Sequence, residues 1–329
     1  MEGRGEQMRY LIIGAGGTGG FMAANMAEAG LDVAVIARGE HLQRIRAQGL
    51  GLETPERGEY TVWVKACSME EYLGTDRGDG GAKVFDGQAP DVIFVCVKGY
   101  SLKEAVSFIR QAAGEKTIVI PVLNIYGTGG RIQEKLPEIL VTDGCIYISA
   151  NISSPGHLKR HGDVFRVVFG LRRGQKAEES QRERLGAVEA DLRKAGIEGI
   201  LSENIERDAL LKFSYVSPQA GCGLYCHAEA GAIQKDDGMR GFFIQLVREV
   251  DAVAKAMGID FGEDIVKRNL AILDALKPTA STSMQRDLEK GDQSEIDGLI
   301  YEVVRLGEKY GVDVPGYRKV SEKYQGIYR

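Results

Sequence analysis

The pattern of hydrophobic residues changes near residue 202. Before it, short apolar runs alternate with segments of helical spacing. Nearly continuous apolar runs are typical of parallel strands buried on both faces, whereas spacing of three and four residues is typical of helices. We predict strands at residues 10–13, 32–37, 91–97, 117–122 and 145–150, the last three buried in a parallel sheet. We predict helices at residues 20–29, 41–48, 101–113 and 129–136. This alternation indicates an α/β Rossmann-type domain with a parallel sheet at residues 1–202.

Other segments of this domain are less regular. Residues 49–67 alternate like one or two strands, and residues 74–82 are rich in Gly and Asp, as exposed loops are. Residues 157–171 have the pattern of an antiparallel hairpin. Residues 177–195 have the spacing of a long amphipathic helix, and a last short strand follows near Ile200.

After Ser202, strand patterns nearly vanish and helical periods continue through Tyr324. Glycine and proline interrupt them, because both are unfavourable inside a helix. We predict helix breaks at residues 221–223, Gly258, Gly291, Gly311 and Pro315. Residues 203–329 should therefore form a second, mostly α-helical domain.

The sequence Gly-Ala-Gly-Gly-Thr-Gly, which begins at Gly14, lies between the first predicted strand and the first predicted helix. In that context, Gly-x-Gly-x-x-Gly is typical of dinucleotide binding. Gly14 would allow the tight turn, Gly16 the approach of the pyrophosphate, and Gly19 close packing of the helix. Gly17 and Thr18 lie where the helix begins, and free N–H groups at such an end bind phosphates. The alternative is a strand–helix turn that merely favours glycine.

The residue after the second strand indicates which nicotinamide cofactor is bound. An Asp or Glu near this point binds the ribose hydroxyls of NAD, whereas an Arg accommodates the 2′-phosphate of NADP. Here the strand ends with Ala37 and Arg38, and the nearest acid, Glu40, follows two residues later. We therefore expect NADP(H), with Arg38 bound to the phosphate. The alternative is a solvated arginine in a loop.

Two further residues follow buried strands, at the sheet edge where open parallel sheets bind ligands. Lys98 follows the strand at residues 91–97, and Asn124 follows the strand at residues 117–122. We expect both to contact the cofactor, and Asn124 to bridge the nicotinamide ribose and a substrate. For Lys98, a surface residue that caps a helix is an equal alternative.

Composition and charge argue against several classes of protein. Of the 329 residues, 43% are hydrophobic and 27% are charged, and no apolar run approaches the roughly 18 residues of a membrane span. The net charge is −5, with Lys and Arg scattered among acids, so we expect no nucleic-acid partner. The first residues lack the apolar core of a signal peptide. We expect a cytoplasmic protein without membrane attachment.

The five cysteines are an odd number without paired spacing, which favours reduced thiols. Cys222, Cys226 and His227 are close in sequence, but they lack the second pair of ligands that a structural zinc site requires. We therefore expect no bound metal.

Several segments together resemble the ketopantoate reductase (2-dehydropantoate 2-reductase) family. They are LIIGAGGTGG, ARGEHLQRIRAQGL, DVIFVCVKGYSL and the segment that runs from Ser281 to Pro315. The last is the most specific. Members of that family show three motifs there: Ser-Ser-Met, Thr-Glu-Ile-Asp and Gly-Ile-x-x-Pro. At the matching places this chain has Ser-Met at Ser283, Ser-Glu-Ile-Asp at Ser294 and Gly-Val-Asp-Val-Pro at Gly311. The resemblance covers nearly the whole chain.

The resemblance implies reduction of ketopantoate to pantoate by NADPH, in the route to pantothenate and coenzyme A. The family's catalytic lysine falls on Lys212, and its substrate- and lysine-associated glutamate on Glu295. Its substrate-binding serine falls on Ser283, and its active-site asparagine on Asn124. An ammonium group beside the ketone would supply the proton and the positive charge that the forming alkoxide needs. The alternatives are a solvated helical lysine at 212, a helix N-cap at 283 and an exposed acid at 295.

Three positions depart from the family pattern. Val216 and Ala220 stand where pantoate-forming members usually carry asparagines. The family's Gln-Asn-Gly-x-Gly run is altered to Leu-Asn-Ile-Tyr-Gly, which places Tyr126 close to the expected nicotinamide site. Loss of a hydrogen-bonding group can redirect specificity. A relative that acts on another small 2-oxo or hydroxy acid therefore stays open, as does a non-catalytic NADP-binding sensor. The amphipathic faces of the helical domain also leave a homodimer open.

Overall fold

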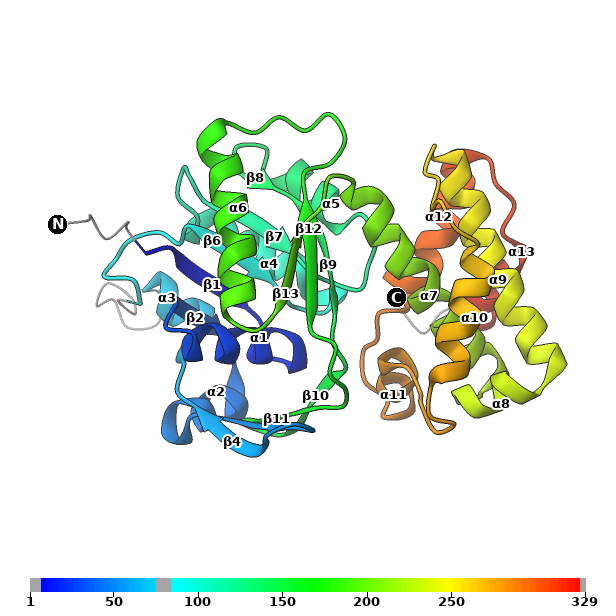
Figure 1. The fold of residues 1–329 in the computed structure, drawn as a ribbon, viewed down its shortest axis with the longest axis horizontal. Helices are drawn as coiled ribbons and strands as arrows, with labels where there is room; N and C mark the ends of the chain where they lie inside the picture. Colours follow the sequence, from blue (N-terminus) through cyan, green and yellow to red (C-terminus); the bar gives the residue numbers. More distant parts are fainter. Residues whose placement is uncertain (1–6, 75–83, 326–329) are drawn as a thin grey trace. The chain divides into compact units, whose positions relative to one another are not determined.

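The computed structural model describes residues 7–74 and 84–325, and its contacts divide the chain into two compact units (Figure 1). Unit 1 comprises Met1–Leu123 and Gly127–Ile205. Unit 2 comprises Asn124–Tyr126 and Glu206–Arg329. The glycine-rich loop predicted at residues 74–82 lies outside the described residues except for Gly74.

A six-stranded parallel sheet forms the centre of unit 1, in the order β5-β2-β1-β6-β7-β8. Its strands are β1 (Arg9–Ile13), β2 (Asp32–Ile36), β5 (Lys65–Cys67), β6 (Val92–Val95), β7 (Ile118–Pro121) and β8 (Leu140–Val141). Its connecting helices are α1 (Gly17–Glu28), α2 (Gly39–Gln48), α3 (Met69–Leu73), the 3₁₀ helix η1 (Gly99–Ser101), α4 (Leu102–Ala112) and α5 (Thr128–Lys135). The predicted Rossmann-type fold is confirmed.

Alternate residues of β1 enter two different cores, because successive side chains of a strand point to opposite faces. Tyr10 and Ile12 pack in one core with side chains of α1 and α6 (Glu179–Lys194). Leu11 and Ile13 pack in the other core with side chains of α4 and α5. Helices therefore cover both faces of the sheet, as the continuous apolar runs predicted.

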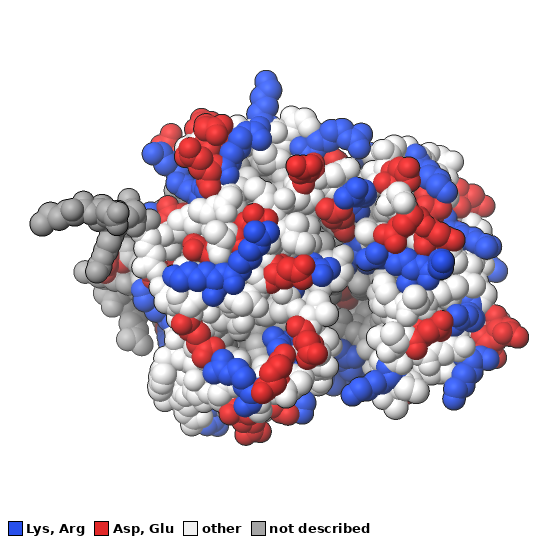
Figure 2. Space-filling model, in the orientation of Figure 1, with Lys and Arg blue, Asp and Glu red and all other residues white. Residues whose placement is uncertain are grey.

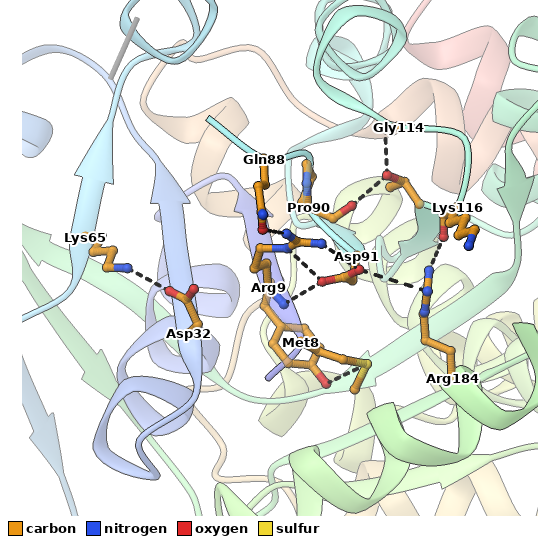
Figure 3. Close-up of polar contacts among 12 residues, drawn as sticks. Met8, Arg9, Asp32, Lys65, Gln88, Pro90, Asp91, Gly114, Lys116 and Arg184 are labelled. Carbon is orange, nitrogen blue, oxygen red and sulfur yellow. Dashed lines mark hydrogen bonds and ion pairs between the residues drawn. The ribbon is translucent and has the colours of Figure 1, made fainter. Parts of the chain in front are cut away.

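Ion pairs join the amino ends of β1 and β6 (Figure 3). The backbone N–H of Arg9 and its guanidinium Nε both donate to the Asp91 carboxylate, at 3.0 and 2.9 Å. Another guanidinium nitrogen of Arg9 donates to Gln88, and Arg184 of α6 lies 4.0 Å from Asp91. These contacts fix the register of β1 and β6 at the amino ends of the two strands. The glycine loop follows β1 at the opposite, carboxyl end.

Unit 1 also contains two smaller sheets. One has the order β10-β11-β3-β4 and the other has the order β13-β12-β9. Their strands are β3 (Leu50–Thr54), β4 (Gly58–Val62), β9 (Asp143–Tyr147), β10 (Ala150–Ser154), β11 (His157–Arg160), β12 (Arg166–Gly170) and β13 (Glu198–Leu201).

Two strand predictions for this region are wrong. The run at residues 145–150 was expected in the parallel sheet, but β9 pairs antiparallel with β12, and the short β8 takes the edge position instead. The hairpin predicted at residues 157–171 does not form, because β11 pairs with β10 and β3 whereas β12 pairs with β9 and β13. An apolar pattern reports burial and not the pairing partner, so it cannot assign a strand to one of several sheets.

Every regular element described in unit 2 is a helix. They are α7 (Ile205–Cys226), α8 (Ala230–Lys235), α9 (Asp237–Ala256), α10 (Ile265–Ala275), α11 (Ser283–Glu289), the π-helix η2 (Asp297–Tyr301), α12 (Glu302–Tyr310) and α13 (Pro315–Lys323). Breaks occur as predicted near Gly258, Gly291, Gly311 and Pro315.

The predicted break at residues 221–223 is wrong, because α7 continues through them. These glycines allow close packing instead: a Cβ atom at Gly221 would lie 3.1 Å from Ile300, and one at Gly223 would lie 2.6 Å from Gln285. Pro218 also lies inside α7. Proline has no N–H, so it leaves the carbonyl four residues earlier, that of Ser214, without its helical donor. The buried Asn269 Nδ2 donates to that carbonyl at 2.7 Å and replaces the missing bond.

Surface features of the described residues are ordinary. None of the described helices has both the length and the apolar character needed to cross a membrane. On the face of each unit seen in Figure 2, Lys and Arg are interspersed with Asp and Glu. No broad area of one charge sign is visible on that face.

Candidate active site

Three glycines of the nucleotide loop have different surroundings in unit 1. Gly14 has φ +105, and a Cβ there would lie 2.9 Å from the Cys96 carbonyl oxygen. A Cβ at Gly19 would lie 2.0 Å from the Gly14 oxygen. A Cβ at Gly16 would meet nothing within 4 Å. Gly14 and Gly19 are thus required by the fold itself, whereas the open side of Gly16 leaves room for a ligand to approach the backbone.

The N-terminus of α1 provides the donors beside this opening. Gly16 is the N-cap, and no side chain caps the helix. Gly17 packs so closely on the start of β10 that a Cβ would lie 2.6 Å from the Ala150 backbone, and Thr18 is half-buried. Uncapped N–H groups at the positive end of a twelve-residue helix fit the pyrophosphate of a dinucleotide.

Cys96 packs against the loop, since a Cβ at Gly19 would lie 2.9 Å from the Cys96 Cβ. Burial raises the pKa of the Cys96 thiol, so it stays protonated and neutral.

Arg38 and Lys98 follow β2 and β6, at the carboxyl ends of these strands. Arg38 is the N-cap residue of α2, its side chain is 80% exposed, and it lies 3.8 Å from the exposed carboxylate of Glu104. An ion pair at that distance in solvent contributes little, so Arg38 can bind another anion. Lys98 is half-buried at the N-cap position of η1, without a side-chain capping bond.

In unit 2, the ammonium of Lys212 donates to the Asn124 amide oxygen at 2.6 Å. Lys212 lies on α7 and is only 9% exposed. The solvated lysine considered above is therefore wrong, since burial of an ammonium requires polar partners. The structure brings these two residues together although they are 88 positions apart in the sequence.

Glu295 is 4% exposed, so the alternative of an exposed acid is also wrong. Its segment is held against α7, because the Ser217 hydroxyl donates to the Leu299 carbonyl at 2.6 Å. It is also held against the Asn124 segment, because a Cβ at Gly298 would lie 2.3 Å from the Ile125 side chain. Three segments of unit 2 therefore meet, and they carry the lysine, the asparagine and the glutamate.

The supporting residue Ser217 was not predicted from the sequence. It lies five residues after Lys212 and is fully buried. Since its single proton goes to Leu299, the Tyr317 hydroxyl must donate to Ser217 in their 2.7 Å contact. Burial raises the pKa of Tyr317 well above its usual value, which keeps that donor protonated. In the sequence, the only indication of this role is that a small polar residue stands next to a proline within a helical segment.

Ser283 is the first residue of α11 and is half-buried. Thr282, rather than Ser283, is the N-cap, and its side chain accepts from the Gln285 N–H at 3.3 Å. The N-cap alternative for Ser283 is therefore wrong, and its hydroxyl is not used by the cap.

The three positions that depart from the family pattern also lie in unit 2. Val216 and Ala220 follow Lys212 at intervals of four residues, so they share its face of α7. Val216 is half-buried and Ala220 is fully buried. The ring of Tyr126 lies 6.1 Å from that of Phe213, centroid to centroid. The helix face beside the lysine is apolar at these positions.

Metal ligands are not grouped anywhere in residues 7–74 and 84–325: no three His, Cys, Asp or Glu side chains are placed to hold an ion. All five cysteines are free thiols, and burial raises the pKa of Cys67 to about 12.

Two models of protein families match this chain. "Ketopantoate reductase PanE/ApbA" matches residues 10–174, and "Ketopantoate reductase PanE/ApbA C terminal" matches residues 204–327. The chain belongs to the ketopantoate reductase family. It is accordingly an oxidoreductase that acts on CH–OH groups with a nicotinamide cofactor.

Relatives within the ketopantoate reductase family cover nearly all of the chain. The 2-dehydropantoate 2-reductase of Mesorhizobium japonicum is 28% identical over 91% of this chain and 91% of its own. The ketopantoate reductase structure from Ralstonia eutropha is 25% identical with a TM-score of 0.83, over 97% and 98% of the two chains. A D-mandelate dehydrogenase solved with NADH and anilino(oxo)acetate has a TM-score of 0.80 at 20% identity, over 96% of each chain, and shares the fold.

Proposed function

We propose that this protein uses NADPH to reduce 2-dehydropantoate (ketopantoate) to pantoate, in the cytoplasmic route to pantothenate and coenzyme A. The observation that carries the proposal is the buried Lys212 ammonium, held at 2.6 Å by the Asn124 amide oxygen. A buried ammonium group is suited to polarise a ketone oxygen and to protonate it.

The chain's own residues then perform the proton chemistry. NADPH, when bound, supplies a hydride to the ketone carbon. The electron pair of the C=O π bond moves to the oxygen, and Lys212 Nζ gives that oxygen a proton, so that a hydroxyl group forms. Asn124 Oδ1 accepts one Lys212 N–H at 2.6 Å and thereby orients the ammonium group. The neutral amine then regains a proton from solvent.

Glu295 and Ser283 are proposed to position the substrate. The buried Glu295 carboxylate can hold the lysine or accept from a substrate hydroxyl, because its segment is anchored to α7. The Ser283 hydroxyl, which the cap of α11 does not use, can donate to the substrate carboxylate.

The preference for NADPH rests on Arg38. It is exposed after β2, where the strand is followed by Ala37 and Arg38 and not directly by an acid, and its ion pair with Glu104 is weak at 3.8 Å. Lys98 and the glycine loop are proposed to bind the same cofactor, from the ends of neighbouring strands. A homodimer stays a prediction.

A second candidate is the reduction of a different 2-oxo acid with an apolar side chain. Val216 and Ala220 offer no hydrogen bond on the Lys212 face of α7, and Tyr126 adds a ring beside Phe213. Such a site would lose its preference for the hydroxyl group of ketopantoate.

The test is the loss of NADPH absorbance with purified protein, measured with ketopantoate and with a panel of 2-oxo acids that bear methyl, isopropyl, isobutyl and phenyl groups. The same series with NADH measures the cofactor preference. Turnover of ketopantoate with the highest kcat/KM supports the first candidate, whereas a higher value for an apolar acid supports the second. Absence of turnover with every acid would overturn both.

A further inference from the structure

His41 connects the nucleotide loop of unit 1 to the turn between β10 and β11. Its Nδ1 lies 2.9 Å from the Gly156 backbone nitrogen, and its Nε2 lies 2.8 Å from the Ala15 carbonyl oxygen. A backbone N–H can only donate, so Nδ1 must be the acceptor. The proton of the neutral ring therefore sits on Nε2 and is donated to Ala15.

The loop rests on the same hairpin at two more points. A Cβ at Gly17 would lie 2.6 Å from the Ala150 backbone, at the start of β10. A Cβ at Gly20 would lie 2.4 Å from the Leu158 side chain on β11. Close packing alone resists compression but does not set the rotation of a peptide plane. The hydrogen bond from His41 does, because it is directional.

The carbonyl that His41 binds belongs to the peptide between Ala15 and Gly16. This peptide is trans, so its C=O and N–H point in opposite directions. When His41 holds the Ala15 carbonyl, the Gly16 N–H is directed away from α2. Gly16 is also the residue whose Cβ position is open.

We propose that His41 is a positioning residue for the dinucleotide: its Nε2–H fixes the Ala15–Gly16 peptide so that the Gly16 N–H is aimed at the pyrophosphate. This inference rests on the proposed binding of NADPH by the glycine loop. His41 touches the loop backbone and the hairpin, so it acts through the loop and not on the reacting atoms.

The experiment compares three variants of the full chain by direct titration with NADPH, followed by nucleotide fluorescence. His41→Ala removes both bonds, His41→Gln retains an amide donor and a carbonyl acceptor, and Arg44→Ala changes an exposed side chain on the same helix. We expect His41→Ala to raise the Kd for NADPH about tenfold, the effect of one lost hydrogen bond. We expect His41→Gln to stay within about threefold of the wild type and Arg44→Ala to be unchanged. With the substrate found above, kcat at saturating NADPH should not change in any of them.

Two results would overturn this inference and leave the proposed function intact. One is wild-type affinity for NADPH in His41→Ala. The other is an equal loss of NADPH affinity in His41→Gln and His41→Ala, which would assign the effect to lost ring packing. If His41→Ala does not fold, as judged by circular dichroism, His41→Phe is measured in its place with the same expectations. A wild-type protein that binds neither NADPH nor NADH would overturn the proposed function together with this inference.

Discussion

Different glycine residues of the nucleotide loop are needed for folding and for cofactor binding. Gly16 has φ −69, which any residue adopts, and its Cβ position is open. We expect Gly16→Ala to keep the thermal stability of the free protein but to weaken NADPH binding at least about tenfold, because the new methyl group occupies the approach of the pyrophosphate.

The matched control is Gly14→Ala, at a residue with φ +105 whose Cβ would lie 2.9 Å from a carbonyl oxygen. It should lower the free energy of unfolding by more than about 1 kcal/mol. Calorimetry with and without NADPH checks both variants. Equal loss of stability in the two would argue against an open approach at Gly16.

Arg38 provides a second test at a single residue. A charge-assisted hydrogen bond to a phosphate contributes roughly 1.5 to 3 kcal/mol, so Arg38→Ala should weaken NADPH binding by about one to two decades. NADH binding should be unchanged, since NADH lacks the 2′-phosphate. Titration of both cofactors measures this, with Arg44→Ala as the control of equal charge change. An unaltered preference for NADPH over NADH would remove Arg38 from the phosphate site.

Single residues of the site differ in how far the sequence could predict them. The glycine loop was predictable from its own spacing and flanking elements. Lys212 and Glu295 were predictable only through the family resemblance, because a lysine and a glutamate in helical segments are usually solvated. Their burial depends on contacts between distant parts of the chain, such as Lys212 with Asn124 and Ser217 with Leu299.

Helices and strands were predicted well where apolar periodicity alone determines the type of element. The parallel strands and the helices between them follow from apolar periodicity. The errors arose where the sheet to which a strand belongs depends on its pairing strand. Strand β9 pairs outside the parallel sheet, and β11 and β12 belong to different sheets. Helix α7 was predicted to break because its glycines were interpreted by propensity, although packing against Ile300 and Gln285 requires them.

The proline inside α7 gives a test at the level of the element. Asn269 replaces the bond that Pro218 cannot make to Ser214, so Asn269→Ala should leave a buried carbonyl without a donor. The expected loss in the free energy of unfolding is about 1 to 3 kcal/mol. In a Pro218→Ala background the helix regains its own N–H, and the same substitution should cost less.

Urea unfolding of the wild type, the two single variants and the double variant measures this coupling. An equal cost of Asn269→Ala in both backgrounds would mean that the amide does not compensate for the proline.

On the scale of the whole molecule, the proposed reaction divides its tasks between two units. The glycine loop, Arg38 and Lys98 belong to unit 1, whereas Asn124, Lys212 and Glu295 belong to unit 2. The order of elements along the chain predicted this division into an α/β part and a helical part. The proposal further implies that cofactor binding and proton transfer can be separated by substitution.

The decisive measurement is therefore turnover and NADPH affinity in Lys212→Ala, with the exposed Lys319→Ala of α13 as the matched control. We predict that Lys212→Ala lowers kcat for reduction of the preferred 2-oxo acid by about 10² to 10⁴ while its Kd for NADPH stays near that of the wild type. Lys319→Ala should match the wild type in both. Unchanged kcat in Lys212→Ala would contradict its assignment as the proton donor.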